Sequence, residues 1–324
     1  MSSVGRCFAR ATLACLAAGA GTAAHAHAHA PVRTPSGALG EGIVTALLVL
    51  AAVAYSIGLH RVWRRVGFRA QRLNTLRALS FGAGLSFVAA ALVSPLDRGG
   101  GQFFSLHMIQ HELLMLVAAP LLVAGRPLPL FLWCFGDSAR ASVAHAGRLR
   151  VVRTVWRALL SPLMAWTLHA LTLWLWHVPA FFDAAMRNAL VHDVQHVTFL
   201  AAALAFWAAL FETRRPEQQG AAVLYLFTTT VHTSVLGALI TFATHPWYSA
   251  YLQIPRDIGL TALEDQQLGG LIMWVPGSIV YVGVALALLV RWIGASDSTG
   301  TVHRVAGGRE RADSERGGMR QDLT

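Results

Sequence analysis

Long apolar runs are the feature that most constrains how this chain can fold. Runs of roughly 17–25 residues, each long enough to cross a bilayer as a helix, alternate with short arginine-rich loops. The chain is 55% hydrophobic and only 13% charged, whereas soluble domains carry about 25% charged residues. Its mean hydropathy is +0.51. The sequence therefore predicts an all-α fold, a polytopic membrane helical bundle of about seven transmembrane helices.

The seven runs define the predicted spans. They are Gly42–Leu59, Leu76–Val93, Leu106–Ala124, Leu160–Trp176, Val191–Phe211, Ala221–Ala243 and Leu268–Trp292. Before them, residues 1–24 have the basic start and small-residue end of a signal peptide, and residues 25–41 form a histidine-containing segment with His25, His27 and His29. Residues 42–293 are the predicted membrane domain. Residues 294–324 are rich in Gly, Arg and acidic residues, which predicts a disordered cytoplasmic tail.

The arginines predict the orientation of the bundle, because cytoplasmic loops keep an excess of positive charge. All 26 basic residues are arginine. Twenty of them follow the first, third, fifth and seventh predicted spans, and four lie in the segments on the opposite side. We therefore expect the N-terminus outside and the C-terminus in the cytoplasm. The net charge of +10 comes from arginines that orient the chain in the membrane. We therefore expect no nucleic acid as a partner.

Two histidine pairs open two of the apolar runs. His107 and His111 begin the third predicted span, and His192 and His196 begin the fifth. Residues four apart share one face of a helix, and imidazoles at this depth in a membrane are costly unless they bind or pair with something. We predict that the four histidines converge on one metal site in the outer half of the bundle.

Further candidate ligands lie at a similar depth. They are His177, Met273 and Met108, with Met108 expected to act in metal transfer. Three carboxylates, Asp97, Asp193 and Asp265, are expected to orient ligands by hydrogen bonds or to dock a partner. Cys7, Cys15 and Cys134 form no CxxC motif, so the donors would be imidazole and thioether, which together suit copper. Each of these side chains could also serve packing or interhelical hydrogen bonding.

Other hypotheses use other histidines. His169 and His232 fall near mid-membrane on different predicted helices, where they could be the axial ligands of a haem. The sequence His192-Asp193-x-x-His196 is related to the His-Glu-x-x-His pattern of metalloproteases, which suggests a membrane metallohydrolase, although aspartate replaces the usual glutamate. A metal permease is a further possibility. The clustering of the candidate ligands at one face of the membrane argues against it.

Several motifs resemble a known family. They are the two histidine pairs, Trp176-His177-Val178-Pro179, and the run from Asp265 to Gly277, in which Gln266–Gly277 reads Q-Q-L-G-G-L-I-M-W-V-P-G. With these, the chain from about Gly42 to Trp292 is similar to the membrane-integral cytochrome c oxidase assembly factor CtaG family. A single-span copper chaperone shares that family name, but this chain has too many spans and lacks the expected cysteine pair.

The resemblance implies a seven-helix assembly factor, not an enzyme, that helps to mature a haem–copper oxidase at a copper-insertion step. Its expected location is the bacterial inner membrane, with a copper site facing the periplasm. The expected partners are cytochrome c oxidase subunits, the lipid bilayer and, as a further possibility, periplasmic copper chaperones.

Overall fold

The computed structural model describes residues 38–65, 67–212, 216–253 and 259–321. The predicted signal peptide and the His25–His29 tract lie outside the described residues. All regular elements within the described residues are helical. These elements are α2 (Ala38–Trp63), α3 (Phe68–Leu92), α4 (Pro95–Gly100), α5 (Phe104–Glu112), the π-helix η1 (Leu113–Ala118), α6 (Ala119–Ala124), α7 (Pro127–Cys134), α8 (Asp137–Arg148), α9 (Arg150–Leu159), α10 (Pro162–His177), α11 (Pro179–Arg187), α12 (Ala189–Glu212), α13 (Pro216–Thr241), the 3-10 turn η2 (Ser249–Tyr251) and α14 (Ala262–Gln321).

Six helical stretches are long and apolar enough to cross a membrane. They are Gly40–Trp63, Gln71–Leu92, Phe104–Ala124, Ala189–Glu212, Gln218–Thr241 and Ala262–Gly294. Each overlaps one predicted span, and the third consists of α5, η1 and α6 in succession. A seventh span is present if α9 and α10 are counted together. The structure thus confirms the predicted all-α membrane bundle of about seven helices.

The chain bends sharply at the start of the predicted fourth span, Leu160–Trp176, most of which forms α10, and the sequence analysis did not predict this bend. Helices α9 and α10 meet at an angle of 62°, at the sequence Leu160-Ser161-Pro162. Proline disfavours a helical conformation in the residue before it, and Ser161 is extended at ψ 139°. Helix α9 also carries Arg150, Arg153 and Arg157, which belong at the membrane surface rather than in its interior.

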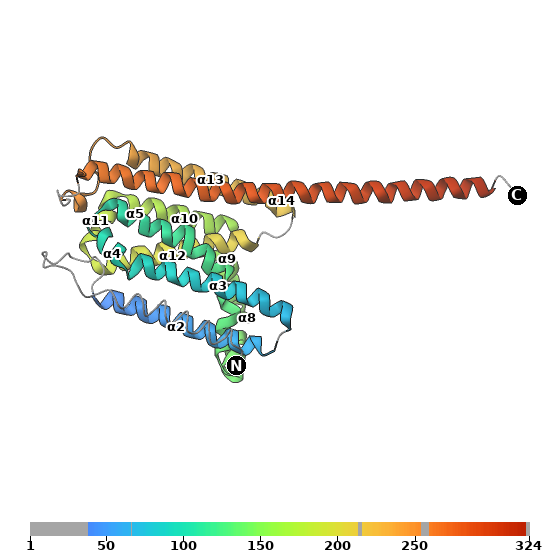
Figure 1. Ribbon diagram of the computed structural model, residues 1–324, viewed down its shortest axis with the longest axis horizontal. Helices are drawn as coiled ribbons and strands as arrows, with labels where there is room; N and C mark the ends of the chain where they lie inside the picture. Colours follow the sequence, from blue (N-terminus) through green and yellow to red (C-terminus); the bar gives the residue numbers. More distant parts are fainter. Residues whose placement is uncertain (1–37, 66, 213–215, 254–258, 322–324) are drawn as a thin grey trace.

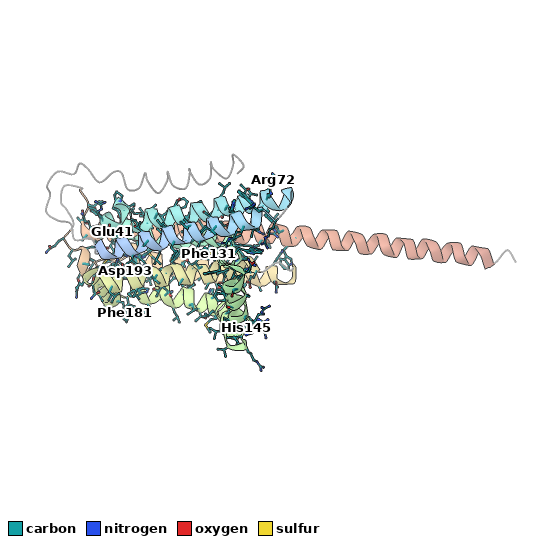
Figure 2. The ribbon with its side chains drawn as sticks, turned by 90° about the horizontal axis from the view of Figure 1, so that it is seen from below. Glu41, Arg72, Phe131, His145, Phe181 and Asp193 are labelled. Atoms are coloured by element: carbon teal, nitrogen blue, oxygen red, sulfur yellow. The ribbon has the colours of Figure 1, made fainter. Side chains whose placement is uncertain are left out.

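The spans lie side by side along one axis, so the bundle has two ends (Figure 1). Helices α4 and α11 lie at one end, which we call the α4–α11 end. Helix α8 projects from the opposite end, transverse to the spans (Figure 2). In the same view Asp193 and Glu41 are near the α4–α11 end, while Arg72 and His145 are at the α8 end.

The C-terminal tail differs from the sequence-based expectation. The sequence predicted disorder beyond residue 294, whereas α14 continues without a break to Gln321 and extends beyond the bundle (Figure 1). The tail contains no proline after Pro276, and extending an existing helix is far easier than starting one. The apolar part of α14 therefore provides the nucleus from which a polar segment continues as helix.

Helices α13 and α14 approach closely through two glycines. A Cβ atom on Gly270 would lie 2.6 Å from the backbone nitrogen of Thr241 and 2.9 Å from the carbonyl oxygen of Gly237. A Cβ on Gly237 would lie 2.8 Å from Cβ of Trp274. Small residues at such positions let membrane helices pack backbone to backbone, where van der Waals contact provides much of the association energy.

We predict opposite effects from two alanine substitutions in α14. Gly270→Ala should destabilise the protein by about 1–3 kcal/mol, because the new methyl group must push α13 away. Gly283→Ala is the matched control, since no atom lies within 4 Å of its Cβ position, and it should be neutral or stabilising by up to about 1 kcal/mol. Thermal unfolding in detergent compares them, and equal shifts in the two variants would contradict the close packing.

Candidate metal centre

Helix α5 positions the first histidine pair. His107 and His111 are 0% and 2% exposed, one turn apart on the same helix. The start of α5 is fixed by Asp265 at the first turn of α14. Its carboxylate accepts hydrogen bonds from the backbone N–H groups of Phe104 (2.6 Å) and Ser105 (3.3 Å). These are donors that a helix start leaves without partners, and a carboxylate also suits the positive end of the helix dipole.

Helix α12 positions the second pair. Its start is fixed by Asn188, whose side-chain oxygen accepts hydrogen bonds from the backbone N–H groups of Leu190 (2.9 Å) and Val191 (3.2 Å). An asparagine in this position is a favourable helix cap. His192 and His196 follow within the first two turns and are 1% and 4% exposed. Both pairs therefore lie just inside helix starts that polar side chains hold in place.

The two pairs converge. Within the pairs, the ring centroids are 4.4 Å apart for His107 and His111 and 4.3 Å for His192 and His196. Between the pairs, His107 lies 5.4 Å from His192 and 5.5 Å from His196, and His111 lies 5.3 Å from His196. Ring nitrogens of His107, His192 and His196 all lie within 4.8 Å of one another, so small movements of the side chains would let them share a single ion. The sequence predicted that four rings share one ion; the rings of all four lie together, but the close set of nitrogens includes three of them and not His111.

Most ring nitrogens of this cluster lack partners. Both nitrogens of His111 and His192, and Nε2 of His196, have no hydrogen-bond partner among the residues that the structure describes. A buried polar group without a partner costs about 1–3 kcal/mol. A shared metal ion is the simplest single ligand that would satisfy one nitrogen on each ring.

His177 lies beside the four-histidine cluster at the end of α10. Its ring centroid is 6.2 Å from that of His111, and its side chain is 3% exposed. Nδ1 lies 2.7 Å from the backbone carbonyl oxygen of Leu173. In the tautomer with the proton on Nδ1, this nitrogen donates to that carbonyl, and Nε2 keeps a free lone pair. Nε2 has no partner in the described chain. Metal-binding histidines commonly have this arrangement, so His177 is available as an additional ligand.

The two methionines predicted as ligands lie elsewhere in the packing. Met108 is fully buried on α5 and packs towards Gly269 of α14, whose Cβ would lie 3.2 Å from Cγ of Met108. Met273 lines a small cavity with His169 and Glu112. Helical spacing could not show in advance which way each thioether faces, so the sequence did not reveal these two locations.

The three predicted carboxylates have different surroundings. Asp97 in α4 is 2% exposed and accepts a hydrogen bond from Nε2 of Gln110 at 3.0 Å. Asp265 caps α5, as described above. Asp193 is half-buried, and its Oδ2 lies 3.1 Å from the Cβ position of Gly40 at the start of α2. Asp97 and Asp265 thus act on the helix that carries His107 and His111.

Two glutamines near the histidines were not predicted as functional residues. Gln110 and Gln195 are both fully buried, and each precedes the second histidine of its pair in the sequences H-M-I-Q-H and H-D-V-Q-H. Gln110 also donates to the backbone carbonyl of Ala91 at 2.8 Å, which ties α5 to α3. The repeated glutamine was the signal in the sequence that could have identified them.

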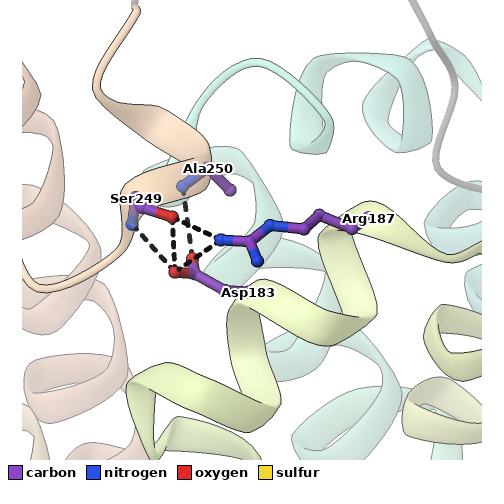
Figure 3. A network of polar contacts seen from close by, with 4 residues as sticks. All are labelled: Asp183, Arg187, Ser249 and Ala250. Atoms are coloured by element: carbon purple, nitrogen blue, oxygen red, sulfur yellow. Dashed lines mark hydrogen bonds and ion pairs between the residues drawn. The ribbon is translucent and has the colours of Figure 1, made fainter.

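A polar clamp outside the spans holds the loop before α14 against α11. Asp183 accepts hydrogen bonds from the hydroxyl and backbone N–H of Ser249 and from the backbone N–H of Ala250 (Figure 3). Arg187 lies 3.5 Å from the Asp183 carboxylate and donates to Ser249 Oγ at 2.9 Å. The sequence analysis missed this clamp, since it joins residues more than 60 positions apart.

The clamped loop brings one tyrosine onto the end of α4 and another onto the end of α10. Tyr251 donates to the carbonyl of Gly100 at 2.6 Å, and Tyr248 donates to the carbonyl of His177 at 3.1 Å. Burial, followed by the negative charge of Asp265, raises the pKa of Tyr251 well above its ordinary value. Tyr251 is therefore a neutral donor at any physiological pH, and its hydrogen bond to Gly100 does not depend on pH there.

The geometry bears on the two competing hypotheses. His169 and His232 have ring centroids 6.1 Å apart, but Phe206 packs on His169 at 4.6 Å and the cavity beside His169 measures ≈10 Å³. That space admits one atom rather than a porphyrin. The metallohydrolase hypothesis needs Asp193 near the metal, whereas the Asp193 carboxylate lies beside Gly40. Both observations favour the four-histidine cluster as the functional site.

Comparison with known proteins supplies the family. The sequence profile of the cytochrome c oxidase caa3 assembly factors (Caa3_CtaG) matches residues 53–295. An uncharacterized protein of Mycobacterium bovis, Mb0105, and one of Mycobacterium tuberculosis, MT0111, are each 25% identical over 264 residues.

The aligned region covers 78% of this chain and 39% of either mycobacterial protein, so the chain spans about two fifths of the curated relatives it matches. No solved structure matches the chain. The family profile covers the bundle from the second half of α2 to the apolar part of α14, and with it both histidine pairs. The chain therefore belongs to the family of cytochrome c oxidase caa3 assembly factors.

Proposed function

We propose that this protein binds copper between α5 and α12 and passes it to a cytochrome c oxidase subunit during assembly. His107, His111, His192 and His196 would hold the ion, and His177 would serve as an additional or exchanging ligand. The observation that carries the proposal is the cluster of buried imidazoles, with nitrogens of three rings within 4.8 Å of one another. Membership of an oxidase assembly family supports a haem–copper oxidase as the recipient.

The donor set supports a copper ion that can be released. Imidazole suits copper and zinc, and none of the proposed ligands is a thiolate, so the site would lack the strongest anionic donor. Protein ligands must be free of protons before they bind a metal. Neutral imidazoles in a water-poor interior meet that condition. A carrier needs this balance, because the ion must leave for the oxidase.

We further propose that the α4–α11 end of the bundle faces the periplasm of a bacterial inner membrane. Arginines dominate the opposite end: α8 and α9 together carry Arg140, Arg148, Arg150, Arg153 and Arg157. Helix α4 and helix α11 carry one arginine each. The buried histidines lie near the α4–α11 end, where copper could be exchanged with periplasmic copper chaperones.

Reporter fusions test the orientation. A fusion after Arg150 should report a cytoplasmic location, and a fusion after Ala184 should report a periplasmic one, because the basic loops stay inside. Alkaline phosphatase and green fluorescent protein fusions measure the two locations independently. The reverse pattern would remove the delivery proposal, since the histidines would then lie near the cytoplasm.

Alanine substitutions test the proposed ligands themselves. His111→Ala and His196→Ala should each weaken copper binding at this site by at least about tenfold, since even groups that only orient metal ligands contribute factors of about 10–100. Oxidase activity in the cell should fall with it, while the variant still accumulates in the membrane. Copper competition titrations on purified protein and oxidase activity of isolated membranes provide the two measurements.

His60→Ala is the matched control for these variants. His60 is exposed in the last turn of α2, at the end of the bundle away from the cluster, and its replacement should alter neither copper binding nor oxidase activity. Undiminished copper affinity in both the His111 and His196 variants would contradict the site. Tight zinc binding with no copper binding would retain the site and reject copper as its ion.

A further inference from the structure

A second set of possible metal ligands surrounds a cavity deeper in the bundle. The cavity measures ≈10 Å³, which is about the space that one water molecule or one ion occupies. Four of its lining residues carry donor atoms that metals use, and they come from α5, η1, α10 and α14: Glu112, Met115, His169 and Met273. None of them belongs to the four-histidine cluster.

Two of these side chains bring donor atoms without partners. His169 is 1% exposed, and its Nδ1 has no hydrogen-bond partner among the described residues. The same holds for Oε2 of Glu112. On the other side of the ring, Nε2 of His169 lies 3.3 Å from the hydroxyl of Tyr281. A proton on Nε2, donated to Tyr281, leaves the Nδ1 lone pair free for a metal ion, which is the usual arrangement for a histidine ligand.

The two methionines give the cavity a preference among metals. Met115 and Met273 are 4% and 5% exposed, and both line the cavity. Thioether ligands favour Cu(I) over zinc and over harder cations. Glu112 would supply the single negative charge that balances a monovalent ion in a medium of low dielectric constant.

The local backbone also distinguishes this position. Met115 lies in η1, the π-helical part of the third span, and such segments occur frequently at functional sites. The indole N–H of Trp207 donates to the carbonyl oxygen of Met115 at 2.8 Å, which ties this wide turn to α12. The π-helix begins directly after Glu112. Met115 therefore faces a different direction, relative to His107 and His111, from the one that a continuous α-helix would give it.

We propose that this cavity is a second metal position, which binds Cu(I) through Nδ1 of His169 and the sulfur atoms of Met115 and Met273. The carboxylate of Glu112 balances the charge. The protein then holds two copper ions at different depths, one bound by nitrogen alone and one bound largely by sulfur. The second position does not depend on the first, because the two ligand sets share no residue.

The test uses the full-length protein in detergent, loaded with Cu(I) under anaerobic reducing conditions and freed of loose metal with a chelator. Metal analysis gives the copper content, and copper-edge X-ray absorption identifies the donor atoms. The wild-type protein should hold two equivalents and show sulfur scattering. The double variant Met115→Leu/Met273→Leu should hold one equivalent without sulfur scattering, since leucine keeps the volume and removes the donors.

Two further variants complete the design. Met164→Leu replaces a methionine of α10 that is 42% exposed, and it should behave as the wild type. His107→Ala/His196→Ala should lose the nitrogen-bound ion and keep the sulfur-bound one. If this variant keeps both equivalents while the methionine variant loses one, the four-histidine proposal fails and the deeper position stands.

The absence of sulfur scattering in the loaded wild-type protein would overturn the proposal, because the cavity would then hold water and the methionines would serve only packing. Sulfur scattering and two equivalents in the methionine double variant would also overturn it. The wild-type measurement can therefore overturn the proposal even if the double variant does not fold.

Discussion

The interior of a membrane supplies no water, so each buried polar group must find a partner within the protein or bind a ligand. The caps of α5 and α12 meet this requirement: Asp265 and Asn188 satisfy backbone donors that would otherwise be orphaned. The four histidines that follow these caps do not meet it, since most of their ring nitrogens lack partners in the described chain. The metal ion that we propose between α5 and α12 would give these nitrogens a partner at one point.

The elements around the cluster hold its two helices in register. Asp265 joins the start of α5 to α14, Gln110 joins α5 to α3, and Tyr248 joins the loop before α14 to His177. Each of these bonds connects residues distant in sequence to a helix that carries a candidate ligand. The site is therefore built on packed helices and not on loops, which is the arrangement that fixes ligand geometry most accurately. The deeper cavity is lined by residues of α5, η1, α10, α13 and α14.

Much of this arrangement followed from the sequence. Apolar length determined the spans, because the bilayer thickness leaves few alternatives, and i,i+4 spacing was sufficient to place each histidine pair on one face. The bend at Ser161, the π-helix after Glu112 and the helical tail were not predicted, since they depend on local backbone choices that composition does not reveal. The cavity location of Met273 and the capping role of Asp265 depend on how α14 packs against α5, and helical periodicity alone cannot show such contacts.

The most direct test of the central claim is a copper-edge anomalous difference map from crystals of the copper-loaded protein. The account predicts a peak between α5 and α12, bounded by His107, His111, His192 and His196. Empty density among these four rings in a copper-loaded crystal, with copper found only on exposed histidines such as His60 or His245, would contradict it.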